Sequence, residues 1–250
     1  MISITFARLQ LHHKSLEILV HFWNESRMWN SHYHNLFYTP GSAPCRIVLL
    51  VAAALDLQLN LNLVDLGAGE HFKPEFLKMN PQHTLPTLRD GDFSLWESRA
   101  ISRYLINKYG ADSGLYPQDP QARALVDQRL DFDLGTLYLR FGEYYYPVIF
   151  GGAKPDPGLQ KRMEEALEFF NTFLEGQTYA AGSELTLADL SLVATVSTMD
   201  AAGISLKPYP NVEKWFELVK TTAPKYEEVN QKGIDQFKQL ISMLKAKTEL

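Results

Sequence analysis

The chain has 250 residues, of which 46% are hydrophobic, and its formal net charge is −5 at pH 7. This length permits one or two hydrophobic cores, and the mild acidity argues against binding to nucleic acid or to an anionic membrane surface. One cysteine excludes an internal disulfide framework, and no apolar run approaches the ~20 residues that cross a bilayer, so we expect a soluble, cytoplasmic protein.

Residues 1–34 form a leading segment with its own composition. They hold five of the seven histidines, but the spacing of these histidines matches no metal-ligand pattern. Glu17 and Glu25 interrupt the basic character that a transit peptide would have. We therefore expect a poorly ordered extension and no metal site.

The first regular elements are predicted at the start of the remaining chain. The run LFYT, which a Pro-Gly pair ends, is typical of a buried strand. Pro44 occupies the position that helices favour for their first residue, and the apolar run after it predicts a helix to Leu55. Leucines that alternate with polar residues over 57–63 predict a second strand. Together these elements predict a βαβ unit with a right-handed crossover.

A loop with a short helix, a hairpin and a further helix complete a first domain, which we place at residues 35–112. Asp90-Gly91 is a hairpin turn signal between two short apolar runs. The helical periodicity of ESRAISRYLINKYG predicts a helix that Gly110 closes. The segment 113–120 contains proline and glycine and predicts a linker.

Residues 121–250 are predicted to be helical. Thr186 and Asp189 have the spacing of a capping box, in which each side chain can satisfy the other residue's backbone N–H. The segment that follows this cap is almost entirely apolar, which predicts a helix at the centre of a bundle. The pattern therefore predicts an α/β domain followed by an all-α domain.

Six motifs stand in order along the chain: PGSAPCR, NPQHTLPTL, LWESRAI, DQRLDFDLGTLY, YYYP and LTLADL. Together they resemble the arthropod delta class of the cytosolic glutathione S-transferases, over about residues 35–245. The resemblance implies a thioredoxin-like βαβ-α-ββα domain followed by a helical bundle, and glutathione as co-substrate without a metal. It also implies a homodimer whose interface uses the Arg99 helix and the DQRLDFDLGTLY helix. Two features depart from the family pattern: the leading segment, and Leu85 where isoleucine is more common.

Residues Ser42 to Cys45 have the spacing of a C-x-x-C redox motif in which serine replaces the first thiol. Most serines before a helix are N-caps. The start of a helix also favours an anion, because free backbone N–H groups and the macrodipole meet there. The resemblance implies that glutathione brings the missing sulfur and that Ser42 is the catalytic residue that stabilises its thiolate. Cys45 is expected to be buried and to have no redox role.

The resemblance implies further contacts to glutathione from two loops. It implies a cis bond before Pro86, and Leu85 would then pair its backbone with that of the peptide like a one-residue strand. An ordinary trans proline is the alternative that the sequence leaves open. His71 and His83 would lie near the glycine carboxylate of glutathione, although a histidine in a loop is more often simply solvated.

The tripeptide Glu97-Ser98-Arg99 opens the last helix of the first domain. Ser98 is predicted to be the N-cap, and Ile101 stands where a capping box would have Glu. The free N–H groups could then hold a carboxylate, Glu97 would suit an ammonium group and Arg99 would assist, so the resemblance implies binding of the γ-glutamyl end. A plain capped helix with a surface ion pair is the alternative.

Aromatic residues mark the predicted pocket for the acceptor substrate. Aromatics at helical spacing usually belong to a core, whereas the resemblance places this stretch in a cleft between the domains. We expect a mixture, with Tyr144 and Tyr146 in the pocket, some of the others packing, and the last helix providing a roof. The candidate residues are Tyr138, Phe141, Tyr144, Tyr146, Phe150 and Phe237.

The sequence thus predicts an enzyme that conjugates glutathione to hydrophobic electrophiles in detoxification, with dehydrochlorinase or peroxidase side activity on the same thiolate. Two alternatives stay open. One is a binding protein that has the fold without the activity, and intact Ser42, Glu97 and Ser98 argue against it. The other is a glutathione-dependent thiol oxidoreductase, against which the serine at position 42 argues strongly.

Overall fold

The structure is a computed structural model and describes residues 34–248. The extension expected over residues 1–34 lies outside the described residues, with the exception of His34. This histidine begins the first strand, so the first domain starts one position earlier than the predicted boundary at Asn35.

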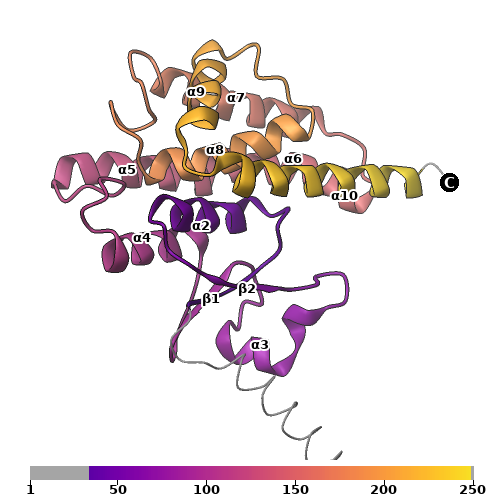
Figure 1. Ribbon diagram of the computed structural model, residues 1–250. Coiled ribbons are helices and arrows are strands. Elements are labelled where there is room, and N and C mark those ends of the chain that lie inside the picture. Colours follow the sequence, from indigo (N-terminus) through magenta and orange to yellow (C-terminus); the bar gives the residue numbers. More distant parts are fainter. Residues whose placement is uncertain (1–33, 249–250) are drawn as a thin grey trace, which may run out of the picture.

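A mixed sheet with the strand order β2-β1-β3-β4 forms the middle layer of the first domain (Figure 1). Strands β1 and β2 run parallel, with Asn35 opposite Asn60, whereas β3 is antiparallel to both β1 and β4. The predicted βαβ unit and hairpin are therefore confirmed. The strands are β1 (His34–Tyr38), β2 (Asn60–Leu63), β3 (Thr87–Asp90) and β4 (Phe93–Trp96).

Strand β2 begins at Asn60, later than the alternating pattern from Leu57 predicted. Asp56 has a left-handed φ of 49°, and the N–H of Leu57 donates to the carbonyl of Ala52 at 2.8 Å. These residues close the preceding helix, so the chain becomes extended only after them.

Helices α2 (Ala43–Ala54), α3 (Pro74–Met79) and α4 (Ser98–Tyr109) pack around the sheet, and a 3₁₀ turn, η1 (Glu70–Phe72), precedes α3. Figure 1 shows α2 and α4 between the sheet and the helical domain, with α3 on the opposite side of the sheet. Helix α2 starts as predicted, with Ser42 as its N-cap and Pro44 in its first turn. Its buried apolar side chains contact both α4 and the helical domain, so this helix joins the two cores.

The helical domain surrounds one central helix. Every residue of α8 from Leu187 to Met199 is buried, which confirms the predicted position of this segment at the centre of the bundle. The domain consists of α5 (Pro120–Phe132), α6 (Tyr138–Gly151), α7 (Pro157–Phe173), α8 (Leu187–Ala201), α9 (Pro210–Thr222) and α10 (Lys232–Thr248).

The predicted capping box of α8 is present. The carboxylate of Asp189 accepts from the N–H of Thr186 at 2.9 Å. It also accepts from the N–H of Ala180 and from the indole N–H of Trp215, at 2.7 and 2.8 Å. Burial raises the pKa of Asp189, and these donors act against that rise. The box therefore also ties the α7–α8 connection and α9 to the central helix.

Two π-helical segments, η2 (Asp133–Leu137) and η3 (Glu227–Gln231), lead directly into α6 and α10. The sequence pattern predicted neither, and such segments often occur at functional sites. Each carries one fully buried polar residue, Asp133 in η2 and Asn230 in η3. Both residues bind an arginine of the first domain, so the π-helical segments lie where the two domains are joined.

Candidate active site

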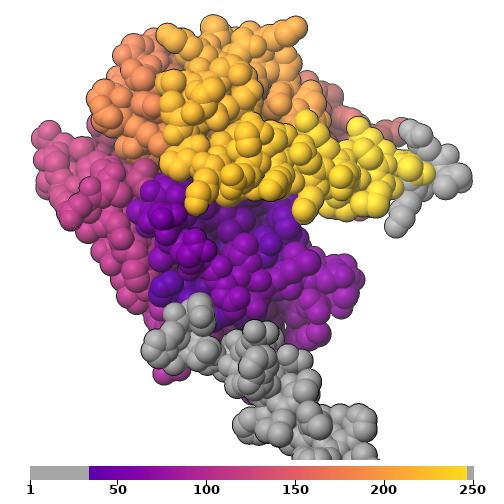
Figure 2. Space-filling model, in the orientation of Figure 1, coloured from indigo at the N-terminus to yellow at the C-terminus, as the bar shows by residue number. Residues whose placement is uncertain are grey.

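A cavity of about 750 Å³ lies between the two domains. In the space-filling view, the molecule is hollowed between α10 and the first domain (Figure 2). A mostly apolar cleft with a few polar groups, at a domain boundary, is the usual form of a site for small molecules. The lining residues are Tyr38 to Ser42, Leu63 to Gly67, Tyr138, Tyr146, Phe150, Gln236, Phe237 and Leu240.

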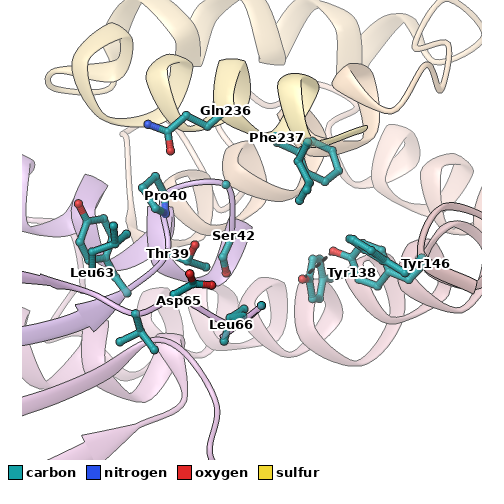
Figure 3. A pocket seen from close by; sticks show the side chains of 16 residues that line it. Thr39, Pro40, Ser42, Leu63, Asp65, Leu66, Tyr138, Tyr146, Gln236 and Phe237 are labelled. Atoms are coloured by element: carbon teal, nitrogen blue, oxygen red, sulfur yellow. Dashed lines mark hydrogen bonds between the residues drawn. The ribbon is translucent and has the colours of Figure 1, made fainter. Parts of the chain in front are cut away.

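Ser42 lines this cavity on the side of the first domain, across from Tyr138 and Tyr146 of α6 (Figure 3). As the N-cap of α2, its hydroxyl oxygen accepts from the N–H of Cys45 at 3.4 Å, which is a long hydrogen bond. The capping role and the position at the cavity thus occur together. The start of a twelve-residue helix faces the cavity here, and the helix dipole favours a negative charge.

Cys45 is fully buried, as predicted. Burial raises the pKa of its thiol to about 11, against the hydrogen bond with Ser42. The thiol is therefore protonated at neutral pH and is unreactive.

The wall of the cavity in the helical domain includes a pair of tyrosines. The hydroxyls of Tyr138 and Tyr146 are 2.9 Å apart, and burial raises the pKa of both groups. Tyr138, Tyr146 and Phe150 are spaced by eight and four positions, so they share one face of α6. Tyr144 stands two positions from Tyr146, about 200° around the helix, and it is half-buried away from the cavity. Tyr144 was predicted to line the pocket, but it lies outside the lining of the cavity.

Phe141 belongs to the core: it is fully buried and stacks on Tyr145 with ring centroids 5.2 Å apart. Phe237 of α10 covers the cavity from the other side, as expected for a roof (Figure 3). Sequence reasoning missed Gln236 and Leu240, which lie beside it. Their spacing of three and four residues on one face of the last helix was the available signal.

The loop before β3 has the predicted cis bond between Leu85 and Pro86. The side-chain amide of Asn80 holds this loop, because it donates to the carbonyl of Thr84 at 3.0 Å and to the hydroxyl of Thr87 at 2.9 Å. Pro86 is buried and Leu85 is half-buried. Both lie outside the lining of the cavity.

The two predicted loop histidines lie together in the first domain. His83 is exposed, has a φ of 47°, and its ring centroid is 6.1 Å from that of His71. The ring of Phe72 packs near both, with centroids 3.9 Å from His71 and 4.8 Å from His83. Like the residues of the cis loop, these side chains lie outside the lining of the cavity.

The start of α4 differs from the prediction. The N-cap is Glu97, not Ser98, and Glu97 has a φ of 69°, which is costly for a residue other than glycine. Within residues 34–248, no side chain caps this end. Ser98 is therefore the first helical residue and is buried, whereas Glu97 is exposed.

Arg99 points into the domain boundary and not to the surface. Its Nη2 donates to Oδ2 of Asp133 at 2.5 Å, and its Nη1 donates to the hydroxyl of Ser98 at 3.3 Å. The side chains of Arg99 and Asp133 are 7% and 0% exposed, so this is a buried ion pair and not the surface pair that was the alternative.

Among the described residues, 34–248, no helix is long and apolar enough to cross a membrane. In the same part of the chain, no group of three or more histidine, cysteine, aspartate or glutamate side chains could hold a metal ion.

A thioredoxin-like domain, a helical domain and an apolar cleft between them, with a serine at a helix start, define a class of glutathione-using enzymes. Family models agree: residues 34–107 match the glutathione S-transferase N-terminal domain, and residues 150–221 match the C-terminal domain. The chain belongs to the glutathione S-transferase family, whose members use glutathione as a substrate.

Solved structures from insects refine this result. A delta-class glutathione transferase of Nilaparvata lugens is 51% identical, with a TM-score of 0.83, over 84% of this chain and 99% of that one. A glutathione transferase of Bombyx mori is 44% identical, with a TM-score of 0.81, over 84% and 98%. An epsilon-class enzyme of the housefly, Musca domestica, is 38% identical, with a TM-score of 0.78, over 86% and 98%. The resemblance to the delta class and the predicted fold are confirmed.

Proposed function

We propose that the protein conjugates the thiolate of reduced glutathione to hydrophobic electrophiles, and that the hydroxyl of Ser42 donates a hydrogen bond to the sulfur. The observation that carries this proposal is the position of Ser42, which is at once the N-cap of α2 and part of the cavity lining. A hydroxyl donor, a helix N-terminus and a cleft that accepts apolar molecules are the three elements that the reaction needs.

The chemistry follows from these elements. The thiol of glutathione loses its proton to solvent, and the dipole of α2 and the Ser42 hydroxyl stabilise the anion. The thiolate attacks the electrophilic carbon, a carbon–sulfur bond forms, and the leaving group departs with its electron pair. The rate gain comes from holding the thiolate and the acceptor together in one cleft. Cys45 cannot compete, because its thiol is buried and protonated.

The acceptor side suits apolar molecules. Tyr138, Tyr146, Phe150 and Phe237 present aromatic surface to the cavity, opposite Ser42, which supports a role in detoxification. The same thiolate can remove a proton next to a carbon–chlorine bond, so that chloride leaves. It can also attack an oxygen of an organic hydroperoxide, which breaks the O–O bond, releases the alcohol and leaves glutathione sulfenic acid. The thiol of a second glutathione then forms the disulfide and releases water.

The same proposal assigns binding residues to the other parts of the glutathione molecule. The backbone of Leu85, beside cis-Pro86, would pair with the peptide, and His71 and His83 would face its glycine carboxylate. The uncapped N–H groups at Ser98 and the exposed carboxylate of Glu97 suit the γ-glutamyl end. Because Arg99 is engaged with Asp133, it would act by holding Ser98.

A cytoplasmic homodimer is the proposed state of the protein. Exposed apolar side chains support an interface that involves α4 and the α5–η2 helix: Leu125 is 48% exposed, Leu134 is 45% exposed, and Phe93 of the neighbouring β4 is 48% exposed. The single cysteine of the chain fits a reducing compartment.

The test of the proposal is the rate of conjugation of glutathione to an activated aryl chloride by the wild type and two variants. Ser42→Ala removes the proposed donor and should lower kcat/KM at least ~10²-fold, as loss of a donor to a developing or bound anion does. Thr221→Val removes a hydroxyl at an exposed position of α9, outside the cavity lining, and should leave the rate within about twofold of the wild type. Equal rates for Ser42→Ala and the wild type would contradict the role of Ser42, and an inactive wild type that binds glutathione would favour a binding protein.

A further inference from the structure

The first turn of α2 contains a buried charge that the proposed chemistry has not used. Arg46 is fully buried, and its guanidinium reaches into the helical domain. Its Nη1 donates to the hydroxyl of Ser197 at 3.1 Å and to the side-chain oxygen of Asn230. Its Nη2 donates to the carbonyl of Ala194 at 3.2 Å and to the hydroxyl of Thr198. All four acceptors are neutral.

No carboxylate of residues 34–248 forms an ion pair with Arg46. Its Nε is buried and has no hydrogen-bond partner in this part of the chain. Burial lowers the pKa of Arg46 to about 10, so the group still carries its charge at neutral pH. Buried charges are normally paired, because an unpaired one is costly. The fold therefore maintains an uncompensated cation at this place.

The residue that carries this cation lies close in the chain to the proposed site of the thiolate. The N–H of Arg46 donates to the carbonyl of Ser42 at 3.0 Å, so the two residues are one helical turn apart. The Arg46 charge also acts on Tyr138 and Tyr146, the tyrosines that line the cavity: it lowers the pKa of both groups, against the larger effect of burial. Its field thus extends to the cavity wall.

The helix that roofs the cavity packs against the same residue. A Cβ atom at Gly233, at the start of α10, would lie 2.5 Å from the carbonyl oxygen of Pro40 and even closer to Cδ of Arg46. The glycine therefore allows α10 to approach both Arg46 and the Pro40-Gly41 turn. Phe237 of the same helix lies 3.6 Å, through its backbone, from a Cβ placed on Gly41.

We propose that Arg46 is a positioning residue for the reaction: it fixes the Ser42 turn against the helical domain, and its uncompensated charge stabilises the glutathione thiolate at Ser42. This inference rests on the proposed function. Neutral acceptors hold the guanidinium without cancelling its field, whereas a carboxylate would cancel it. In a protein interior of low dielectric constant, such a charge acts over several ångströms, and it adds to the field of the helix N-terminus.

The test adds a carboxylate without removing the arginine. Replacing Arg46 itself would remove four hydrogen bonds together with the charge, and the variant could fail for want of folding. Asn230→Asp keeps an oxygen for Arg46 and neutralises its charge. The matched control is Asn171→Asp, at a half-buried position on α7, where the side-chain oxygen accepts from the N–H of Asn211 at 2.9 Å. Both variants add one negative charge to the chain.

The readout is the pKa of the thiol of bound glutathione, obtained by titrating the thiolate absorbance at saturating glutathione, with binding measured by calorimetry. Asn230→Asp should raise this thiol pKa by roughly half a unit or more, as expected for neutralising one buried charge that acts on the cavity. Asn171→Asp should leave it at the wild-type value.

The possible results distinguish a failure of the Arg46 inference from a failure of the proposed function. If the thiol pKa is the same in Asn230→Asp and the wild type, Arg46 is only a structural link and the inference is wrong. An equal rise in both variants would show a general effect of net charge and would also overturn it. If the wild type itself binds glutathione without lowering its thiol pKa, the proposed function fails, and the inference fails with it.

Discussion

Two arginines of the first domain reach into the helical domain, and the fold treats their charges differently. Arg99 meets the carboxylate of Asp133 in η2, in a pair that is almost fully buried. Arg46 meets the amide of Asn230 in η3 and other neutral oxygens. Both contacts join the domains through a π-helical segment, but only the Arg46 charge is left uncompensated. The Arg99 pair shows that two domains can be joined by a compensated charge. The unpaired charge of Arg46 therefore points to a role beyond joining the domains.

The largest expected effect on stability comes from the compensated arginine. Arg99→Met leaves the Asp133 carboxylate buried without its cation and should lower the free energy of unfolding by about 3–5 kcal/mol. Urea unfolding measures this. The half-exposed pair of Arg140 and Glu165 is the control: Glu165→Gln should cost less than about 1 kcal/mol. Similar losses of unfolding free energy in both variants would mean that Asp133 does not depend on Arg99 to compensate its buried charge.

Arg46→Met should cost less, about 1–3 kcal/mol. It removes four hydrogen bonds to neutral acceptors, but the carbonyl of Ala194 and the hydroxyl of Ser197 keep other donors. It also removes the penalty of an unpaired buried charge. The same urea experiment tests this order. If Arg46→Met were the more destabilising of the two methionine variants, the contrast between the two arginines would be reversed.

Gly233 provides a test of the packing around Arg46, because it allows α10 to approach that residue. Gly233→Ala should lower the free energy of unfolding by about 1–3 kcal/mol through overpacking, and it should also slow conjugation, since the Ser42 turn must move. Gly151→Ala is the matched control, at the end of α6, where an added Cβ meets nothing within 4 Å. That control should be neutral or stabilising by up to about 1 kcal/mol. Equal behaviour of the two variants would argue against a close contact at Gly233.

The smallest effect is expected at Asp90, a charge that does not link the domains. Burial acts to raise its pKa, but hydrogen bonds from Lys108, Tyr104 and Tyr109 hold it well below the usual value. A depressed carboxyl pKa stabilises the fold above the unfolded value of about 3.8, and this contribution is lost as the pH falls below that value.

Asp90→Asn should therefore be less stable than the wild type at neutral pH, and the difference should shrink as the pH is lowered from about 5 towards 2. Thermal unfolding across this range is the measurement. A difference that stays constant with pH would show that the carboxylate charge contributes nothing here.

Local patterns were sufficient for most of the fold. The Thr186–Asp189 capping box, the Asp90-Gly91 hairpin and the apolar run of α8 each act over a few residues, and the structure contains all three. The cap of α4 was mispredicted at Ser98 because a serine before a helix is the usual N-cap. The conformation of Glu97, with its positive φ, has no local sequence signal.

Long-range features of the site could not be predicted in the same way. Arg46 belongs to the motif PGSAPCR, but its partner Asn230 is 184 positions away in the chain. Asn230 is buried in η3, a π-helical segment that the sequence pattern did not predict. The aromatic stretch of α6 was recognised, yet the selection of Tyr138 over Tyr144 depends on which face of that helix meets the cavity.

The most direct test of the central claim is a pH titration of the thiolate absorbance of glutathione bound to the wild type and to Ser42→Ala. We expect the wild type to lower the thiol pKa clearly below that of free glutathione, and Ser42→Ala to return it most of the way. Thr221→Val should titrate like the wild type. Tight binding of glutathione with the same thiol pKa in the wild type and in Ser42→Ala would contradict a thiolate stabilised by Ser42.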